Sequence, residues 1–231
     1  IMMKIFRFFL LFVAMASMAV VSEARSPKKP RVEFQTTMGT FVVTLFNETP
    51  LHRDNFLKLV REGYYDGLLF HRVIRNFMVQ AGDPDSRQAP AGKLLGEGGP
   101  GYTLPAEIDP FLYHWRGALA AAREPDNVNP QRRSSGSQFY IVWGKVQQPD
   151  ELAAVNEQIK ENTGGATEIT PERYQTYRSR GGTPHLDGQY TVFGEVTSGL
   201  KVIKKMQAVK TDSNDRPLQD VRIIRTRVLE P

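Results

Sequence analysis

Short apolar segments, separated by turns that contain glycine or proline, constrain this 231-residue chain more than any other feature of its sequence. Residues 32–37 and 40–46 alternate apolar with polar side chains, and Met38-Gly39 lies between them, which predicts a β-hairpin with half-buried strands. We expect further strands within 68–82, which turns at Arg75-Asn76, and over 115–122, 138–143, 190–196 and 221–228. Many short strands with few helices indicate a closed barrel or a sandwich.

Two segments of the strand-rich part have helical signals. Thr49-Pro50 is typical of an N-cap followed by proline at the first helical position, and Phe56, Leu59 and Val60 form an apolar stripe before Gly63. Residues 199–208 have helical spacing as well. We therefore expect two main helices beside the strands.

The segment from about 145 to 182 differs from the rest in composition. Asp150 is the expected cap of one helix, which ends at Gly164-Gly165, and Thr170-Pro171 is the expected start of a second helix, which ends at Gly181-Gly182. We interpret the segment as a helical insertion within one domain. Three roles stay open for this insertion: it covers or extends a groove, it binds a partner, or it is a structural elaboration without a function of its own.

Several classes of function are disfavoured. The chain has no cysteine, which excludes disulfides, thiolate metal sites and a cysteine nucleophile, and its four histidines lack metal-ligand spacing. The net charge of +5 is not gathered into a basic run, so we expect no nucleic-acid partner. Residues 96–101 match G-x-G-x-x-G, but Pro100 interrupts the motif and no helix is expected after it. We expect no cofactor and no metal.

The N-terminal residues have the three parts of a secretory signal peptide. Lys4 and Arg7 precede an apolar run over 8–21, and Ser22-Glu23-Ala24 supplies a small-x-small cleavage pattern. The run has 14 residues, whereas a transmembrane helix needs about 18 or more. We predict a signal peptide over 1–24 and a spacer over 25–31, with an uncleaved membrane anchor as the alternative. The expected location is the periplasm, with the extracellular space as the alternative.

The stretch from Phe70 to Pro84 (FHRVIRNFMVQAGDP) carries the chemistry. Side chains of a strand alternate between its faces, so Met78 and Gln80 share one face, and a tight turn brings Arg72 beside them. From spacing alone, an exposed charge on an edge strand is the favoured interpretation of Arg72.

Four ordered blocks closely resemble the cyclophilin family. The first is FHRVI … FMVQAGD within 70–83, and GALAAAR (117–123), SGSQFYIV (135–142) and LDGQYTVFGEV (186–196) follow. The resemblance spans nearly all of the mature chain, and we assign 32–229 to one cyclophilin-like domain. It implies a mainly β fold, namely a closed eight-stranded antiparallel barrel capped by two helices, and peptidyl-prolyl cis-trans isomerase activity.

The resemblance also implies residue roles. Arg72 is the expected catalytic arginine, and Gln80 helps hold it and the substrate carbonyl. A second group of residues is expected to bind the proline ring and the residues before it: Phe77, Met78, Ala122, Arg123, Gln138, Tyr140, His185, Leu186 and Tyr190. His185 and Tyr190 depart from the family's common tryptophan and histidine, but both rings can still form walls of a proline pocket.

Proline-containing peptides and unfolded exported proteins are the expected partners of a monomer that has no membrane anchor after signal cleavage. Two other functions stay open at this point. One is a non-catalytic chaperone that binds proline peptides on the same scaffold, which has no need to keep Arg72. The other is a barrel that holds a small ligand inside, which requires an interior cavity.

Overall fold

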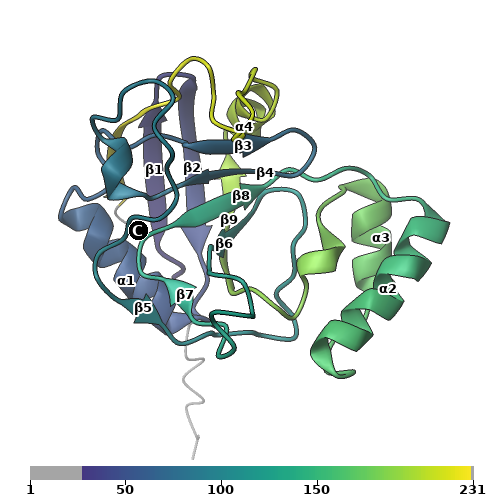
Figure 1. The fold of residues 1–231 in the computed structure, drawn as a ribbon. Helices are drawn as coiled ribbons and strands as arrows, with labels where there is room; N and C mark the ends of the chain where they lie inside the picture. The colour runs from purple at the N-terminus through teal and green to yellow at the C-terminus, as the bar shows by residue number, and fades with distance from the viewer. Residues whose placement is uncertain (1–27, 230–231) are drawn as a thin grey trace, which may run out of the picture.

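A computed structural model describes residues 28–229 of the chain (Figure 1). The expected signal peptide and most of the expected spacer lie outside the described residues. Within 28–229, no helix is both long enough and apolar enough to cross a bilayer.

Eight strands form one antiparallel sheet in the order β10-β1-β2-β9-β6-β8-β4-β3. Their bounds are β1 Arg31–Thr36, β2 Gly39–Leu45, β3 Arg72–Ile74, β4 Met78–Ala81, β6 Ala118–Ala121, β8 Phe139–Val142, β9 Val192–Ser198 and β10 Ile223–Leu229. A two-stranded sheet, β5 (Thr103–Leu104) with β7 (Ser134–Ser135), was not predicted, because two-residue strands leave no periodic pattern. The predicted mainly β fold is confirmed.

The predicted closure of the barrel is not confirmed, since β10 and β3 end the strand order and share no continuous ladder. The segments that precede these two strands do meet, through an isolated bridge between Leu69 and Arg222. Two backbone hydrogen bonds flank it, from Phe70 N to Val221 O and from Ile223 N to Leu68 O, each 2.8 Å. The sheet is therefore curled and open, and irregular chain spans the gap between its ends.

Helices α1 (Pro50–Arg61) and α4 (Leu200–Met206) are the two expected helices, and they lie at opposite ends of the sheet (Figure 1). The predicted stripe of Phe56, Leu59 and Val60 is buried in the core. Thr49 occupies the N-cap position, but its side chain makes no capping hydrogen bond. Pro50 thus starts α1 without help from the threonine hydroxyl.

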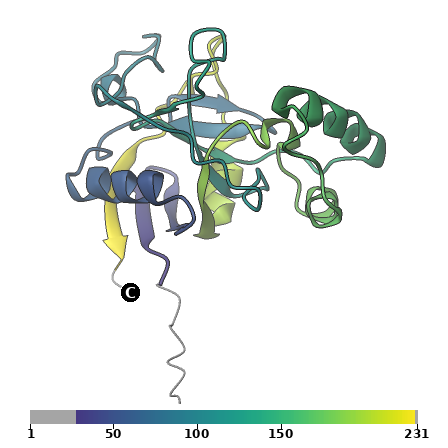
Figure 2. The ribbon, with the colours of Figure 1, turned by 90° about the horizontal axis from the view of Figure 1, so that it is seen from below.

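The insertion consists of α2 (Pro149–Thr163) and α3 (Pro171–Ser179), which lie together on one side of the sheet, away from α1 (Figure 2). The prediction of Asp150 as the cap of α2 was wrong. Gln148 is the cap, in a capping box with Glu151, because Pro149 already occupies the first helical position. Thr170 caps α3 as predicted, since its hydroxyl accepts a hydrogen bond from Arg173 N.

Apolar clusters cover both faces of the central strands. Along β6, Leu119 and Ala121 belong to the inner cluster, whereas Ala118 and Ala120 belong to the outer one. The outer cluster also contains Leu152 and Tyr177 from the insertion and Tyr140 and Met78 from β8 and β4. The insertion therefore covers part of the outer face of the sheet. The inner cluster is centred on aromatic rings and fills the curled sheet.

Phe139 tests this inner packing, because its ring lies 5.5 Å from the rings of Phe56 and Tyr65 and 5.8 Å from that of Phe34. We expect Phe139→Ala to lower the free energy of unfolding by about 3–5 kcal/mol, since it leaves a cavity. Urea unfolding measures the change. Leu94→Ala is the control, because Leu94 is 70% exposed. A loss below about 1 kcal/mol for Phe139→Ala would contradict a close-packed interior.

Candidate active site

A cavity of about 150 Å³ opens on the outer face of the sheet beside β3, β4 and β8. Its lining comprises nine residues: Arg72, Phe77, Met78, Gln80, Ala122, Arg123, Tyr140, Leu186 and Tyr190. All nine are among the eleven residues that the sequence analysis singled out. The remaining two, Gln138 and His185, lie next to the cavity and are described below.

Strand register brings the central residues of the cavity together. Arg72 on β3 pairs with Gln80 on β4, and Gln80 pairs with Tyr140 on β8. The hairpin turns at Asn76, whose φ of 59° is left-handed, a conformation that asparagine tolerates better than most residues. Because these three residues are cross-strand partners, their side chains emerge side by side on one face of the sheet.

Arg72 stands at the rim of the cavity with its side chain 44% exposed. Its Nη1 donates to Gln80 Oε1 at 3.3 Å, and its Nε lies 3.6 Å from Asp215 Oδ2. Asp215 was not predicted, because it lies in a polar loop far along the sequence and nothing local marks it. The two partners leave the guanidinium oriented but still accessible to a ligand.

Gln80, which accepts a hydrogen bond from Arg72, is itself hydrogen-bonded to a second glutamine. Its Nε2 donates to Gln138 Oε1 at 3.0 Å, and Gln138 Nε2 donates to the carbonyls of Gly96 and Gly98 at 2.7 and 2.8 Å. Asp83 accepts from Gly96 N on the same loop. A Cβ at position 98 would overlap the Asp83 carboxylate, so glycine lets the loop pass close to it. The glycine-rich motif is thus a loop fastened beside the cavity.

A second, wider cavity of about 610 Å³ adjoins the first. Gln80, Ala122 and Arg123 line both cavities, and Gln138 lines the wider one. The loop over 96–103 forms another part of its lining. An extended peptide with a ring in the small cavity therefore has space for neighbouring residues in the wider one.

The Arg123 side chain is held in place by several contacts of its own. Its guanidinium carbon lies 4.3 Å from the centre of the Tyr190 ring, and its Nε donates to Gln189 O at 3.0 Å. It also pairs with Asp126 at 2.5 Å, and its side chain is only 3% exposed. Arg123 therefore holds the Tyr190 ring in the wall of the cavity, in addition to lining it.

His185 does not line the cavity, contrary to the expectation that it forms a wall. Its ring stacks on the ring of Phe77 at 5.5 Å with an interplanar angle of 26°. Burial lowers the pKa of His185, so the ring stays neutral and stacks as an apolar surface at neutral pH. The short helix Pro184–Leu186 places Leu186, rather than His185, in the lining.

The arrangement suits binding and hydrogen-bond donation. Rings and a thioether surround the small cavity, and the Arg72 guanidinium faces it from the rim. A small cavity with apolar side chains beside a few polar groups suits a compact ring, while a guanidinium stays charged and offers several fixed donors. The lining contains no serine, threonine, cysteine or lysine, the side chains that most often act as nucleophiles.

Comparisons with known proteins agree with one another. The family model described as "Cyclophilin type peptidyl-prolyl cis-trans isomerase/CLD" matches residues 31–228. The chain is 37% identical to peptidyl-prolyl cis-trans isomerase-like 1 of Aspergillus fumigatus over 201 residues, which is 86% of this chain and 95% of the relative. It is 34% identical to peptidyl-prolyl cis-trans isomerase CYP18-2 of Arabidopsis thaliana, with 87% and 94% covered.

The fold resembles the crystal structure of a cyclophilin-type peptidyl-prolyl cis-trans isomerase of Cryptosporidium parvum. The TM-score is 0.64 at 24% identity, and 88% of this chain and 99% of that chain are covered. A second structure of that protein, obtained in the presence of the dipeptide Ala-Pro, matches with a TM-score of 0.61. At this identity the likeness supports the fold.

His71 lies directly before Arg72 and is buried beneath the same hairpin, with 3% exposure. Burial lowers its pKa from 6.5 to about 4, because the protonated ring is poorly solvated there. The unfolded chain therefore binds a proton between about pH 6.5 and 4 that the folded chain does not. At pH 7 His71 is neutral in both states, so it does not change the free energy of unfolding. As the pH falls from about 6.5 to 4, the unfolded chain gains a proton that the folded chain does not, and the free energy of unfolding decreases.

We expect His71→Phe to reduce the acid sensitivity of the fold, since phenylalanine fills the site and does not titrate. Between pH 7 and 4.5 the unmodified protein should lose about 2–3 kcal/mol more unfolding free energy than the variant. Urea titrations at the two pH values measure the difference. Equal losses in the two proteins would show that His71 does not carry this sensitivity.

Proposed function

Because the chain belongs to the cyclophilin-type peptidyl-prolyl cis-trans isomerases, we propose that the cavity beside Arg72 is its active site and that exported proteins are its substrates. The observation that carries the assignment of the site is the convergence of nine signature-block residues on one cavity. In this proposal the proline ring of a peptide occupies the cavity of about 150 Å³, and the preceding residues lie in the wider one.

The reaction needs a lower barrier and no source of energy. Amide resonance opposes rotation about the C–N bond with a barrier of about 18–20 kcal/mol. The two isomers of an X-Pro bond differ by only about 0.5–1 kcal/mol. Uncatalysed rotation takes tens of seconds, so reaching about a millisecond requires the site to supply about 5–6 kcal/mol.

Arg72 is suited to stabilise the twisted amide. As the C–N bond rotates, the proline nitrogen loses resonance and gains a lone pair, which then accepts a hydrogen bond. A guanidinium donor directed at this nitrogen binds the twisted state more strongly than the planar ground state, which is the condition for catalysis. Gln80 and Asp215 hold the guanidinium in place for this role.

The other lining residues of the cavity are suited to bind the proline ring. Phe77, Met78, Leu186 and the tyrosines provide an apolar surface for the proline ring. This surface removes water from around the amide, and a hydrogen bond to the developing lone pair is stronger in that environment. The curled sheet is filled by its own aromatic cluster, which does not suit a function that holds a ligand inside the sheet.

The export proposal is supported by the basic start, the apolar run and the small-x-small pattern within residues 1–24. Cleavage after Ala24 releases a domain without this apolar segment, and the periplasm is the proposed site of action. There the enzyme accelerates a slow folding step of exported chains, since X-Pro isomerisation limits the folding of many proteins.

The export proposal predicts a processed chain. We expect the full sequence, produced in a Gram-negative bacterium with a C-terminal tag, to enter the periplasmic fraction with Arg25 at its N-terminus. Fractionation and N-terminal sequencing check this. Leu11→Arg, which interrupts the apolar run, should leave the precursor in the cytoplasm. A membrane-bound chain that keeps residues 1–24 would favour the anchor instead.

The site proposal predicts a specific loss of activity. We expect Arg72→Ala to lower kcat/KM for an Ala-Pro-Phe peptide by about 10²–10³, the range for removal of one preorganised transition-state donor. Exchange spectroscopy of the peptide measures the rate. Arg75→Ala is the matched control, since Arg75 is an exposed arginine at the turn of the same hairpin.

Activity of Arg72→Ala within a few-fold of the unmodified protein would remove Arg72 from the mechanism. Peptide binding without any acceleration by the unmodified protein would instead indicate a non-catalytic binder of proline peptides.

A further inference from the structure

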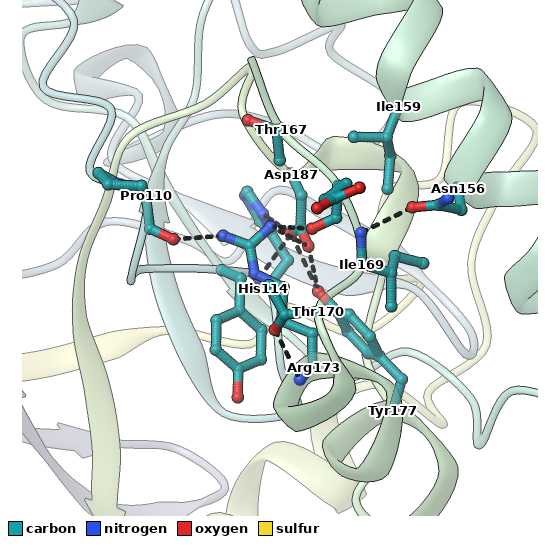
Figure 3. Close-up of polar contacts among 12 residues, drawn as sticks. Pro110, His114, Asn156, Ile159, Thr167, Ile169, Thr170, Arg173, Tyr177 and Asp187 are labelled. Atoms are coloured by element: carbon teal, nitrogen blue, oxygen red, sulfur yellow. Dashed lines mark hydrogen bonds and ion pairs between the residues drawn. The ribbon is translucent and has the colours of Figure 1, made fainter. Parts of the chain in front are cut away.

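Helix α3 of the insertion directs two buried side chains toward the segment that forms one wall of the cavity. Arg173 and Tyr177 lie one turn apart and are 5% and 0% exposed. Arg173 Nη2 donates to Pro110 O at 2.5 Å, and Nη1 lies 3.6 Å from Asp187 Oδ2 (Figure 3). The Tyr177 hydroxyl lies 2.9 and 2.8 Å from the two Asp187 oxygens.

Asp187 is completely buried, yet its carboxylate is well supplied with donors. In addition to Tyr177, the backbone N and the ring Nδ1 of His114 each lie 2.9 Å from Oδ1. A buried carboxylate is strongly destabilising unless donors of this kind surround it. Asp187 directly follows Leu186, so its position determines where that cavity residue stands.

His114 connects the carboxylate to the cavity. Its ring is fully buried, and its Nε2 lies 3.0 Å from the Tyr140 hydroxyl. A carboxylate only accepts hydrogen bonds, so Nδ1 carries a proton, and in the neutral tautomer Nε2 then accepts from the Tyr140 hydroxyl. Burial, together with Tyr190 and Asp187, raises the pKa of Tyr140 well above its ordinary value, so this proton stays on the hydroxyl.

The Tyr140 ring is thereby held on several sides. Its hydroxyl is bonded to His114, and the two rings are nearly parallel at 6.1 Å. The Tyr190 ring meets it edge-on at 6.0 Å. Since Tyr140 lines the cavity, any movement of His114 or Asp187 changes the shape of that wall.

We infer that Asp187 and His114 are positioning residues for the proline pocket, and that the insertion holds them in place through Arg173 and Tyr177. The inference rests on the proposed function, because it concerns the same cavity. It assigns the insertion a role in substrate binding: the chain of hydrogen bonds from α3 through Asp187 and His114 fixes the Tyr140 ring against the proline. A pocket wall touches the proline in both the planar and the twisted state, so its loss should raise KM more than it lowers kcat.

A purely structural role for the same network predicts something different. In that case, loss of a hydroxyl on α3 lowers the stability of the fold and leaves the kinetics of the folded protein unchanged. The two roles are therefore separated by assays run well below the melting temperature, with melting measured in parallel.

Tyr177→Phe removes one hydroxyl at the far end of the network and leaves the ring in place. We expect it to lower kcat/KM about three- to tenfold, the size typical of coupling within a hydrogen-bond network, mainly through KM. Tyr174→Phe is the matched control on the same helix, because the Tyr174 hydroxyl makes no hydrogen bond within residues 28–229. We expect its kinetics to equal those of the unmodified protein.

Two further measurements address the connection itself. If the two hydroxyls act through one network, the variant Tyr177→Phe with Tyr140→Phe should have about the same kcat/KM as the worse single variant, rather than the product of both effects. The ¹⁵N shifts of His114 should show the ring proton on Nδ1, the nitrogen that faces Asp187. Tyr140→Phe should perturb Nε2, which loses its donor.

Unchanged KM and kcat in Tyr177→Phe, with a lower melting temperature, would overturn the positioning role. Independent, multiplicative effects of the two substitutions, or a His114 ring protonated at Nε2, would do the same. Each of these results leaves the proposed function standing, provided that the unmodified protein is active and Arg72→Ala is not. Failure of the proposed function is seen separately, as an inactive unmodified protein.

Discussion

Antiparallel register across β3, β4, β8 and β6 determines most of what this molecule can do. Arg72 pairs with Gln80, Gln80 with Tyr140, and Tyr140 with Ala120, so one row of side chains crosses four strands on the outer face. A slip of one residue in any of these pairs would turn the row inward and expose core residues such as Val79 and Ile141. The burial of the inner face therefore secures the geometry of the outer one.

The outer face combines an open cavity with a covered region. Next to the cavity, Leu152 of α2 and Tyr177 of α3 belong to the same apolar cluster as Ala118, Val142 and Tyr140, while Arg72 remains exposed. Polar groups buried in this region need hydrogen-bond partners, and the Asp187 carboxylate has them in Tyr177 of α3 and in His114. The cavity and the packing of the insertion thus use neighbouring parts of one surface, which is the basis for the proposed coupling between them.

Much of this could be predicted from the residues. The predicted ranges contain or overlap all the main strands, with ends one to four positions from the observed ones, and proline, threonine and glycine marked the ends of α1 and α3. The signature blocks identified nine residues that line one cavity. The prediction of Asp150 as a cap was wrong, and His185 lies beside the cavity rather than in its lining, since each depends on a local geometry that several sequences share. The β5–β7 pair is too short to leave a pattern.

By itself, the sequence determined which segments form strands and where the hairpins turn, because these follow from local periodicity and turn residues, and the signature blocks marked the candidate chemistry. Tertiary structure alone decided that Asp215 meets Arg72, that Arg123 lies over Tyr190, and that α3 reaches Tyr140 through Asp187 and His114. These contacts join residues that lie far apart in the sequence. They depend on how the whole sheet curls and where the insertion packs, which no local pattern encodes.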